Sequence, residues 1–244
     1  MPTQVHLSVV IPAYNEARRI TPTLRSTAQY LLAQPYTSEI LVVLNNCSDN
    51  TLEIVKGLQS EFPIIRYIDM GMVQHPSGTK GLAVRTGILS AVGEYRIYMD
   101  ADNAAQISEI SALWPRIDGG KNIVFGSRYV SGSHVHVSWY RRLLSRASNL
   151  LVQAVLLPKV RDTQCAFKLF SAEATEKIFT QAQCVGWAFD MEVLYLARRY
   201  GYGLREIPIT WNEVGESSLK AKAVFTALSE LVRIRVLAWR GRYE

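Results

Sequence analysis

Two aspartates lie one residue apart in the stretch YMDADN, directly after a run of apolar residues. Asp100 and Asp102 could both face one divalent cation if the chain bends after that run. Carboxylate oxygens are ligands that Mg²⁺ and Mn²⁺ prefer, and waters and substrate phosphates commonly complete the shell. In the structural alternative, Asp102 caps the helix that follows and Asp100 makes a surface contact. The pair by itself leaves both interpretations open.

Basic residues that could meet phosphate lie in two further segments. Lys80 stands among small residues in GTKGLAVRTG, at the expected start of a helix. An ammonium and backbone N–H groups at such a place can bind phosphate oxygens. The segment is not a Walker loop, because the GxxxxGK[ST] spacing is absent. Arg128 follows an apolar strand in GSR and can hold a second anion in its guanidinium fork.

Alternating strand and helix patterns would position these residues. In the first half we expect strands at 6–11, 40–44, 64–68, 95–99 and 122–125, and helices at 17–32, 49–59 and 80–91. In the second half we expect helices at 139–157, 186–200 and 217–240, and strands at 162–170 and 203–209. Apolar strands between helices predict an α/β fold, with a mostly parallel sheet covered by helices on both faces and with C-terminal amphipathic helices.

Polar clusters follow three of the expected strands. They are PAYNE at 12–16, NNCSDN at 45–50 and DADN at 100–103. Any one of them would be an ordinary turn with a helix-capping Asn or Asp. Open α/β sheets bind ligands beyond the carboxyl ends of their strands, so the coincidence of all three predicts a ligand site at that edge.

Composition bounds the class of protein. The chain has 244 residues, 48% of them apolar, and shows no repeat or Pro-, Gly- or Ser-rich linker, which predicts a single domain over 1–244. It has no apolar run of about 18 residues or more and no secretory leader pattern, so we expect a cytoplasmic protein, or one that lies peripherally on the cytoplasmic face of a membrane. Three widely spaced cysteines predict reduced, packed thiols rather than a zinc site or disulfides.

The net charge of +6 is unevenly distributed. Basic residues gather in 139–168 and again in 217–244, which suits phosphate-bearing partners or an anionic membrane surface. The sequence has no RNA- or DNA-binding motif, so nucleic acid is not an expected partner.

The order of motifs resembles a known family. VVIPAYNE, ILVVLNNCSDNT, GTKGLAVRTG, YMDADNA, VFGSRY and RDTQCAFKLF resemble glycosyltransferase family 2, which has the Rossmann-like GT-A fold. The segment GWAFDMEVLYLARRYGYGLREIPITWNEV, at 186–214, is similar to the polyprenyl-phosphate branch, and particularly to the dolichyl-phosphate β-glucosyltransferases. The resemblance covers almost the whole chain. It implies a donor half at about 1–125 and an acceptor half at about 126–244.

The resemblance also implies an activity. This is inverting, metal-dependent transfer of a hexose from a UDP- or GDP-sugar to polyprenyl or dolichyl phosphate, with Mg²⁺ or Mn²⁺ as cofactor. The acceptor phosphate is already anionic, since the second pKa of a phosphate is about 6, so no strong general base is required. The basic helices at 139–157 and at the C-terminus could then contact the membrane surface, or their apolar faces could simply pack on the sheet.

Site residues carry over from the resemblance position by position. The nucleotide-sugar pocket would contain Pro12, Ala13, Tyr14, Glu16, Asn45, Asp49, Lys80, Asp100, Ala101, Asp102 and Lys220. The catalytic residues would be Asp100, Asp102, Arg128, Arg141 and Asp190, with Asp100 and Asp102 at the metal. The two arginines would hold the acceptor phosphate or the donor diphosphate, and Lys220 would close over them.

Two departures from the family pattern bear on specificity. Asn45 and Asn46 stand where the family usually has two aspartates, which leaves UDP and GDP both open because an amide donates as well as accepts. NEVGESSLK, at 212–220, lacks the arginine of mannosyl-transferring relatives, which favours glucose over mannose. Two alternative functions remain. One is a soluble acceptor, with Asp190 or Glu192 as base, and the other is nucleotide-sugar binding without turnover.

Overall fold

The computed structural model describes residues 4–136, 139–212 and 221–243, and within them the side chains outside 136–144, 147 and 221–228. The strands are β1 (Leu7–Ala13), β2 (Ser38–Leu44), β3 (Ile65–Asp69), β4 (Tyr95–Met99), β5 (Asn122–Ser127), β6 (His134–His136), β7 (Phe167–Ser171), β8 (Gly203–Pro208) and β9 (Thr210–Asn212). The α-helices are α1 (Ile20–Leu32), α2 (Thr51–Glu61), α3 (Lys80–Ser90), α4 (Ile110–Leu113), α5 (Trp139–Val155), α6 (Ala172–Phe179), α7 (Phe189–Arg199) and α8 (Ala221–Trp239).

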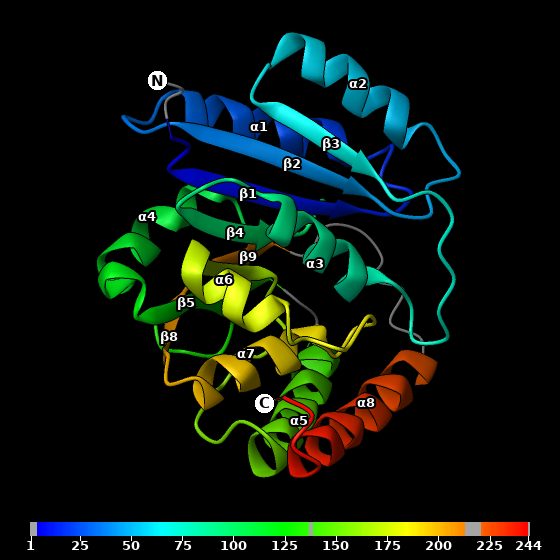
Figure 1. The fold of residues 1–244 in the computed structure, drawn as a ribbon, viewed down its shortest axis with the longest axis vertical. Helices are drawn as coiled ribbons and strands as arrows, with labels where there is room; N and C mark the ends of the chain where they lie inside the picture. The colour runs from blue at the N-terminus through cyan, green and yellow to red at the C-terminus, as the bar shows by residue number, and fades with distance from the viewer. Residues whose placement is uncertain (1–3, 137–138, 213–220, 244) are drawn as a thin grey trace.

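A central sheet of seven strands has the order β3-β2-β1-β4-β7-β5-β8. Neighbouring strands are parallel except at β7, which runs antiparallel to both β4 and β5. The arrowheads of β1 to β4 point to the same side in Figure 1. The expected α/β fold with a mostly parallel sheet is therefore confirmed. The short strands β6 and β9 pair with each other in a second sheet, which the sequence did not predict.

Alternating strand residues face two hydrophobic cores. Val9 and Ile97 belong to the core that α1, α2 and α4 cover, whereas Val10 and Tyr98 belong to the core that α3, α6 and α7 cover. Successive side chains of a strand point to opposite faces, so strands that are apolar at every position are buried on both sides. The sheet is consequently packed between two helical layers.

The expected strands outside 162–170 lie within two residues of the observed ones. The strand expected at 162–170 is confined to Phe167–Ser171, because the carboxylate of Asp162 accepts the backbone N–H of Gln164 in a turn. The helix expected from residue 186 begins at Phe189, since Gly186 packs so closely on Ser77 that a Cβ would lie 2.3 Å from the Ser77 carbonyl oxygen. Helix α6 was not predicted.

Candidate active site

Three strand ends bring the polar clusters together at the carboxyl edge of the sheet. The backbone N–H of Asn45, after β2, donates to the carbonyl of Ala13 at the end of β1, at 2.9 Å. The Thr23 hydroxyl of α1 donates to the carbonyl of Ala101, after β4, at 2.7 Å. The expected convergence at this edge is therefore observed.

Lys80 and Asp100 form the centre of the cluster. The Lys80 Nζ lies 2.6 Å from Asp100 Oδ1, and the Lys80 ammonium lies 5.2 Å from the centre of the Trp187 ring. Burial alone would lower the pKa of Lys80, but Asp100 and Asp190 raise it, and the net pKa is above its ordinary value. The first residue of α3 thus carries a firmly protonated ammonium toward the aspartates.

Excess negative charge marks the other side of the cluster. Burial raises the pKa of Asp102, and the neighbouring Asp100 raises it further. Burial likewise raises the pKa of Glu16, against the lowering effect of its ion pair with Arg19, and Asp102 and Asp100 add to the increase. Carboxylate oxygens that repel one another in this way fit a hard divalent cation, which would offset the charge.

Asp102 also closes a local turn. Its Oδ1 accepts the backbone N–H of Ala104 at 3.0 Å, and its Oδ2 lies 3.9 Å from Arg19 Nη1. Asp102 does not cap the helix that follows, because that 3-10 helix begins at Ile107 with Gln106 at its N-cap and has no side-chain cap hydrogen bond. In the part of the chain that the structure describes, no group of three or more His, Cys, Asp or Glu side chains could hold a metal ion. A cation here would take its remaining ligands from water and from a substrate, as Mg²⁺ commonly does.

Asn45 is turned inward. Its amide donates to the Thr79 hydroxyl at 2.8 Å, and its oxygen accepts from the Asn46 amide at 3.2 Å. The side-chain oxygen of Asn46 accepts the backbone N–H of Val73 at 2.5 Å, and the Asn46 amide donates to the Val73 carbonyl at 2.7 Å. These two amides connect the loops after β2 and β3 to the start of α3, so in this structure they hold these loops together.

Asp49 links the start of α2 to the turn that precedes α1. It accepts the backbone N–H groups of Ala17 and Thr51, at 3.1 and 3.0 Å, and the Thr51 hydroxyl. Its pKa is lowered because these hydrogen bonds outweigh its slight burial. Tyr14, which follows β1, is 60% exposed, whereas Ala13 is buried in the strand.

Arg128 is held by a buried carboxylate. Its Nε and Nη2 lie 2.7 and 2.9 Å from the two oxygens of Asp162, and its backbone N–H donates to the same group at 2.9 Å. The guanidinium also lies 5.1 Å from the centre of the Trp211 ring. Burial alone would raise the pKa of Asp162, but Arg128 lowers it, so both charges persist.

Asp190 and Glu192 lie beneath the site rather than at its surface. Asp190 is 4% exposed; it accepts from the Tyr98 hydroxyl at 2.6 Å and is paired with the fully buried Lys168. Glu192 is fully buried and accepts the N–H of Cys184 at 2.7 Å and the Tyr243 hydroxyl at 2.6 Å. In this conformation neither carboxylate has a surface at which an acceptor could meet it.

Sequence reasoning missed Lys168 as a partner of Asp190. The sequence pattern could have indicated it. The alternation in CAFKLF places Lys168 on the same face as Ala166 and Phe170, which are buried in the core that α3, α6 and α7 cover. A lysine on such a face needs a buried acid. Of the other expected residues, Pro12 lies in β1, Lys220 falls outside the described residues, and the side chain of Arg141 does too.

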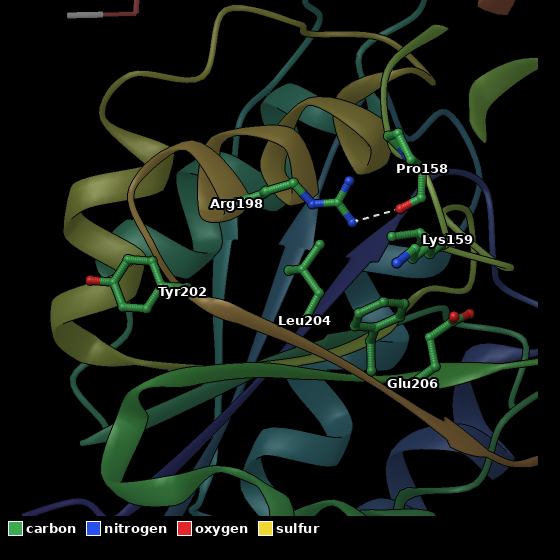
Figure 2. A pocket seen from close by; sticks show the side chains of 8 residues that line it. Pro158, Lys159, Arg198, Tyr202, Leu204 and Glu206 are labelled. Carbon is green, nitrogen blue, oxygen red and sulfur yellow. Dashed lines mark hydrogen bonds between the residues drawn. The ribbon is translucent and has the colours of Figure 1, made fainter. Parts of the chain in front are cut away.

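A cavity of about 430 Å³ lies elsewhere in the molecule, between the end of α7, the loop after α5 and strand β8 (Figure 2). On its wall Arg198 donates to the carbonyl of Pro158 at 2.9 Å. Neither aspartate of the DADN segment lines it. In the described ranges, no helix is long and apolar enough to cross a membrane.

Comparison with known proteins identifies the family. Residues 8–179 match the model of Glycosyl transferase family 2. A dolichyl-phosphate beta-glucosyltransferase from Trichomonas vaginalis is 34% identical over 247 residues, which cover 96% of this chain and 72% of that relative. A dolichyl-phosphate beta-glucosyltransferase from Saccharomyces cerevisiae is 33% identical, over 98% of this chain and 77% of its own.

A solved structure shares the fold. Glucosyl-3-phosphoglycerate synthase from Mycobacterium tuberculosis, in complex with Mn²⁺, uridine-diphosphate-glucose and phosphoglyceric acid, is similar with a TM-score of 0.71. The similarity covers 95% of this chain and 80% of that one, at 14% sequence identity. From the family match over residues 8–179 and from relatives above 30% identity along almost the whole chain, this protein belongs to glycosyltransferase family 2 and is a glycosyltransferase of the GT-A fold.

Proposed function

We propose that this chain transfers a glucosyl residue from a nucleoside-diphosphate sugar to a dolichyl-type polyprenyl phosphate, with Mg²⁺ or Mn²⁺. The observation that carries the proposal is the cluster of Lys80, Asp100 and Asp102 at the carboxyl edge of the sheet, with a 2.6 Å ion pair beside an unbalanced carboxylate. The names of the relatives at 33–34% identity support the sugar and the acceptor.

Positive charges that are already in place beside the leaving diphosphate would lower the activation barrier of sugar transfer. The donor loses a nucleoside diphosphate whose negative charge grows in the transition state, and preorganised cations stabilise such charge. Asp100 and Asp102 would hold the metal, which when bound supplies Lewis-acid stabilisation of the leaving diphosphate. The Lys80 ammonium lies against Asp100 and adds a second positive charge at that place.

The acceptor chemistry is consistent with the buried carboxylates. A phosphate monoester is anionic at neutral pH, since its second pKa is about 6, and it can attack the anomeric carbon without a base. A hydroxyl acceptor would need one. Asp190 and Glu192, the two expected bases, are buried and already hydrogen-bonded, which favours the phosphate acceptor over the soluble-hydroxyl alternative.

Helix α8 presents an apolar and basic face that suits a membrane surface. Val232, Val236 and Trp239 are exposed, with Trp239 at 89%, while Leu231 and Ile234 are buried in the core. Exposed basic residues lie between and beside the apolar ones: Arg233, Arg235 and Arg240. One side of the helix therefore packs on the protein, and we assign the other side to the membrane that holds the acceptor lipid.

One panel of assays tests the proposal. The chain is incubated with UDP-glucose, GDP-glucose or GDP-mannose, with Mg²⁺, Mn²⁺ or EDTA, and with or without dolichyl phosphate in liposomes. Released nucleotide and glycosylated lipid are measured together, because hydrolysis alone would release nucleotide without lipid product. We expect metal-dependent glucosyl transfer to the lipid. Transfer to a soluble acceptor such as phosphoglycerate, with none to dolichyl phosphate, would refute the proposal.

A further inference from the structure

Glu206 clamps the loop that follows α5. It lies on β8, an edge strand of the sheet, opposite Phe125 of β5 in the register. Its two carboxylate oxygens accept two successive backbone N–H groups, those of Arg161 and Asp162, each at 2.9 Å. A carboxylate that receives one N–H at each oxygen fixes both the position and the direction of that backbone segment.

The clamped segment carries the acid that holds Arg128. Asp162 is 1% exposed and binds Arg128 at three points, through the backbone N–H, Nε and Nη2. Because every oxygen of Asp162 is engaged, the guanidinium can keep its position only while the backbone at 161–162 keeps its own. The chain of contacts therefore runs from Glu206 through the peptide N–H groups to Asp162 and then to Arg128.

This arrangement brings a second carboxylate, that of Glu206, close to the buried carboxylate of Asp162. Burial raises the pKa of Glu206, and the nearby charge of Asp162 opposes the donors that lower it. Two carboxylates brought this close repel each other. A glutamine in place of Glu206 would remove the repulsion, but it has a single acceptor oxygen and would place its amide N–H against a backbone N–H.

We propose that Glu206 is a positioning residue, which holds the guanidinium of Arg128 in the orientation that binds the acceptor phosphate by fixing the backbone of Arg161 and Asp162. This inference rests on the proposed function and on the role that the family resemblance implies for Arg128, which would hold the acceptor phosphate or the donor diphosphate; the proposal takes the acceptor phosphate. Glu206 and Lys159 both line the cavity of Figure 2, and no residue of the DADN segment is among its lining residues. The effect of Glu206 on transfer must therefore pass through the loop.

The first test is Glu206→Gln, with Glu173→Gln as the matched control. Glu173 is exposed in the first turn of α6, which follows β7, a strand inside the sheet. Loss of one hydrogen bond to a charged group predicts roughly a tenfold rise in KM for dolichyl phosphate. KM for the nucleotide sugar should stay within about twofold, because the donor cluster is untouched. An equal rise in both KM values would overturn the proposal, since general loosening of the fold would produce it.

A double-mutant cycle tests the route. In the Arg128→Gln background, Glu206→Gln should cause no further rise in acceptor KM, because the guanidinium that Glu206 is proposed to position is already absent. Additive effects of the two substitutions on acceptor KM would overturn the proposal that Glu206 acts through Arg128.

Hydrogen exchange separates failure of the inference from failure of the function. The N–H groups of Arg161 and Asp162 should exchange faster in the Glu206→Gln variant than in the wild type, with or without substrates. Unchanged exchange of the peptide spanning 158–164 would overturn the clamp itself. If the wild type transfers nothing to any polyprenyl phosphate, the proposed function fails while the exchange result still decides whether Glu206 holds the loop.

Discussion

Replacing Lys168 by methionine should destabilise the protein strongly. Lys168 has no exposed surface, its ammonium is paired with Asp190, and it also donates to the carbonyl of Cys165 at 2.6 Å. Methionine fills a similar volume without the charge, so the variant keeps the packing and leaves the Asp190 carboxylate buried with the Tyr98 hydroxyl. The loss then measures the electrostatic cost of an unpaired buried charge.

The magnitude follows from that burial. Removing one partner of a buried ion pair costs about 3–5 kcal/mol. A loss of 1 kcal/mol lowers Tm by about 2–4 °C in a domain of about 150–250 residues, so the expected decrease is roughly 6–20 °C. Replacing both partners, as in Lys168→Met with Asp190→Asn, removes both charges, and an apolar or neutral pair is often as stable as the ion pair it replaces. The double variant should therefore recover much of the loss.

Thermal unfolding followed by circular dichroism measures both effects at pH 7.5. Lys121→Met is the control, because Lys121 is exposed and directly precedes β5. The control should unfold within about 1–2 °C of the wild type, as surface substitutions usually do. A Lys168→Met variant as stable as this control, or a double variant no more stable than the single one, would refute the reasoning about the pair.

Three further predictions concern the site and the membrane. Asp102→Asn should abolish metal-dependent transfer with an unchanged Tm, and full activity of this variant in EDTA would contradict the metal role. As the pH falls, metal-dependent activity should begin to decline at a higher pH than an ordinary carboxylate would give, because the pKa of Asp102 is raised and only its deprotonated form binds a cation. A pH–rate profile at saturating donor measures this, and a flat profile down to pH 4 would speak against it. Trp239→Ala should weaken flotation with anionic liposomes several-fold. The control Val92→Ala, at a residue 55% exposed, should leave flotation unchanged. Equal flotation of both variants would exclude the α8 surface as the membrane contact.

Much of the carboxyl edge could be predicted before the fold was known. Apolar runs such as Ile40–Leu44 and Tyr95–Met99 are local patterns, and the polar residues that follow them must lie at one edge if the strands are parallel. The phosphate-binding role expected for Lys80 followed from its place at the start of a helix. The partner of that lysine did not follow, because the contact between Lys80 and Asp100 joins residues 20 apart in the chain.

The acidic residues of the second half were harder to interpret. Asp190 was expected as a catalytic group, and Asp190 or Glu192 as the base for a soluble acceptor, yet the helix turns both inward. A helix start rich in acids predicts surface charge, and only the packing of α7 on β4 and β7 brings Tyr98 and Lys168 against Asp190. Such pairing depends on three elements that meet from distant parts of the sequence.

By itself, the sequence determined the alternation of elements, the edge at which chemistry is placed and the residue types that meet phosphate there, because each depends on local periodicity and on strand direction. Only the tertiary structure decided which charges are paired. It places Asp162 against Arg128 and Lys168 against Asp190, and it buries Asp102 near Asp100, which raises the pKa of Asp102. The physical reason is that burial and Coulomb interactions depend on distances between residues that the chain order does not constrain.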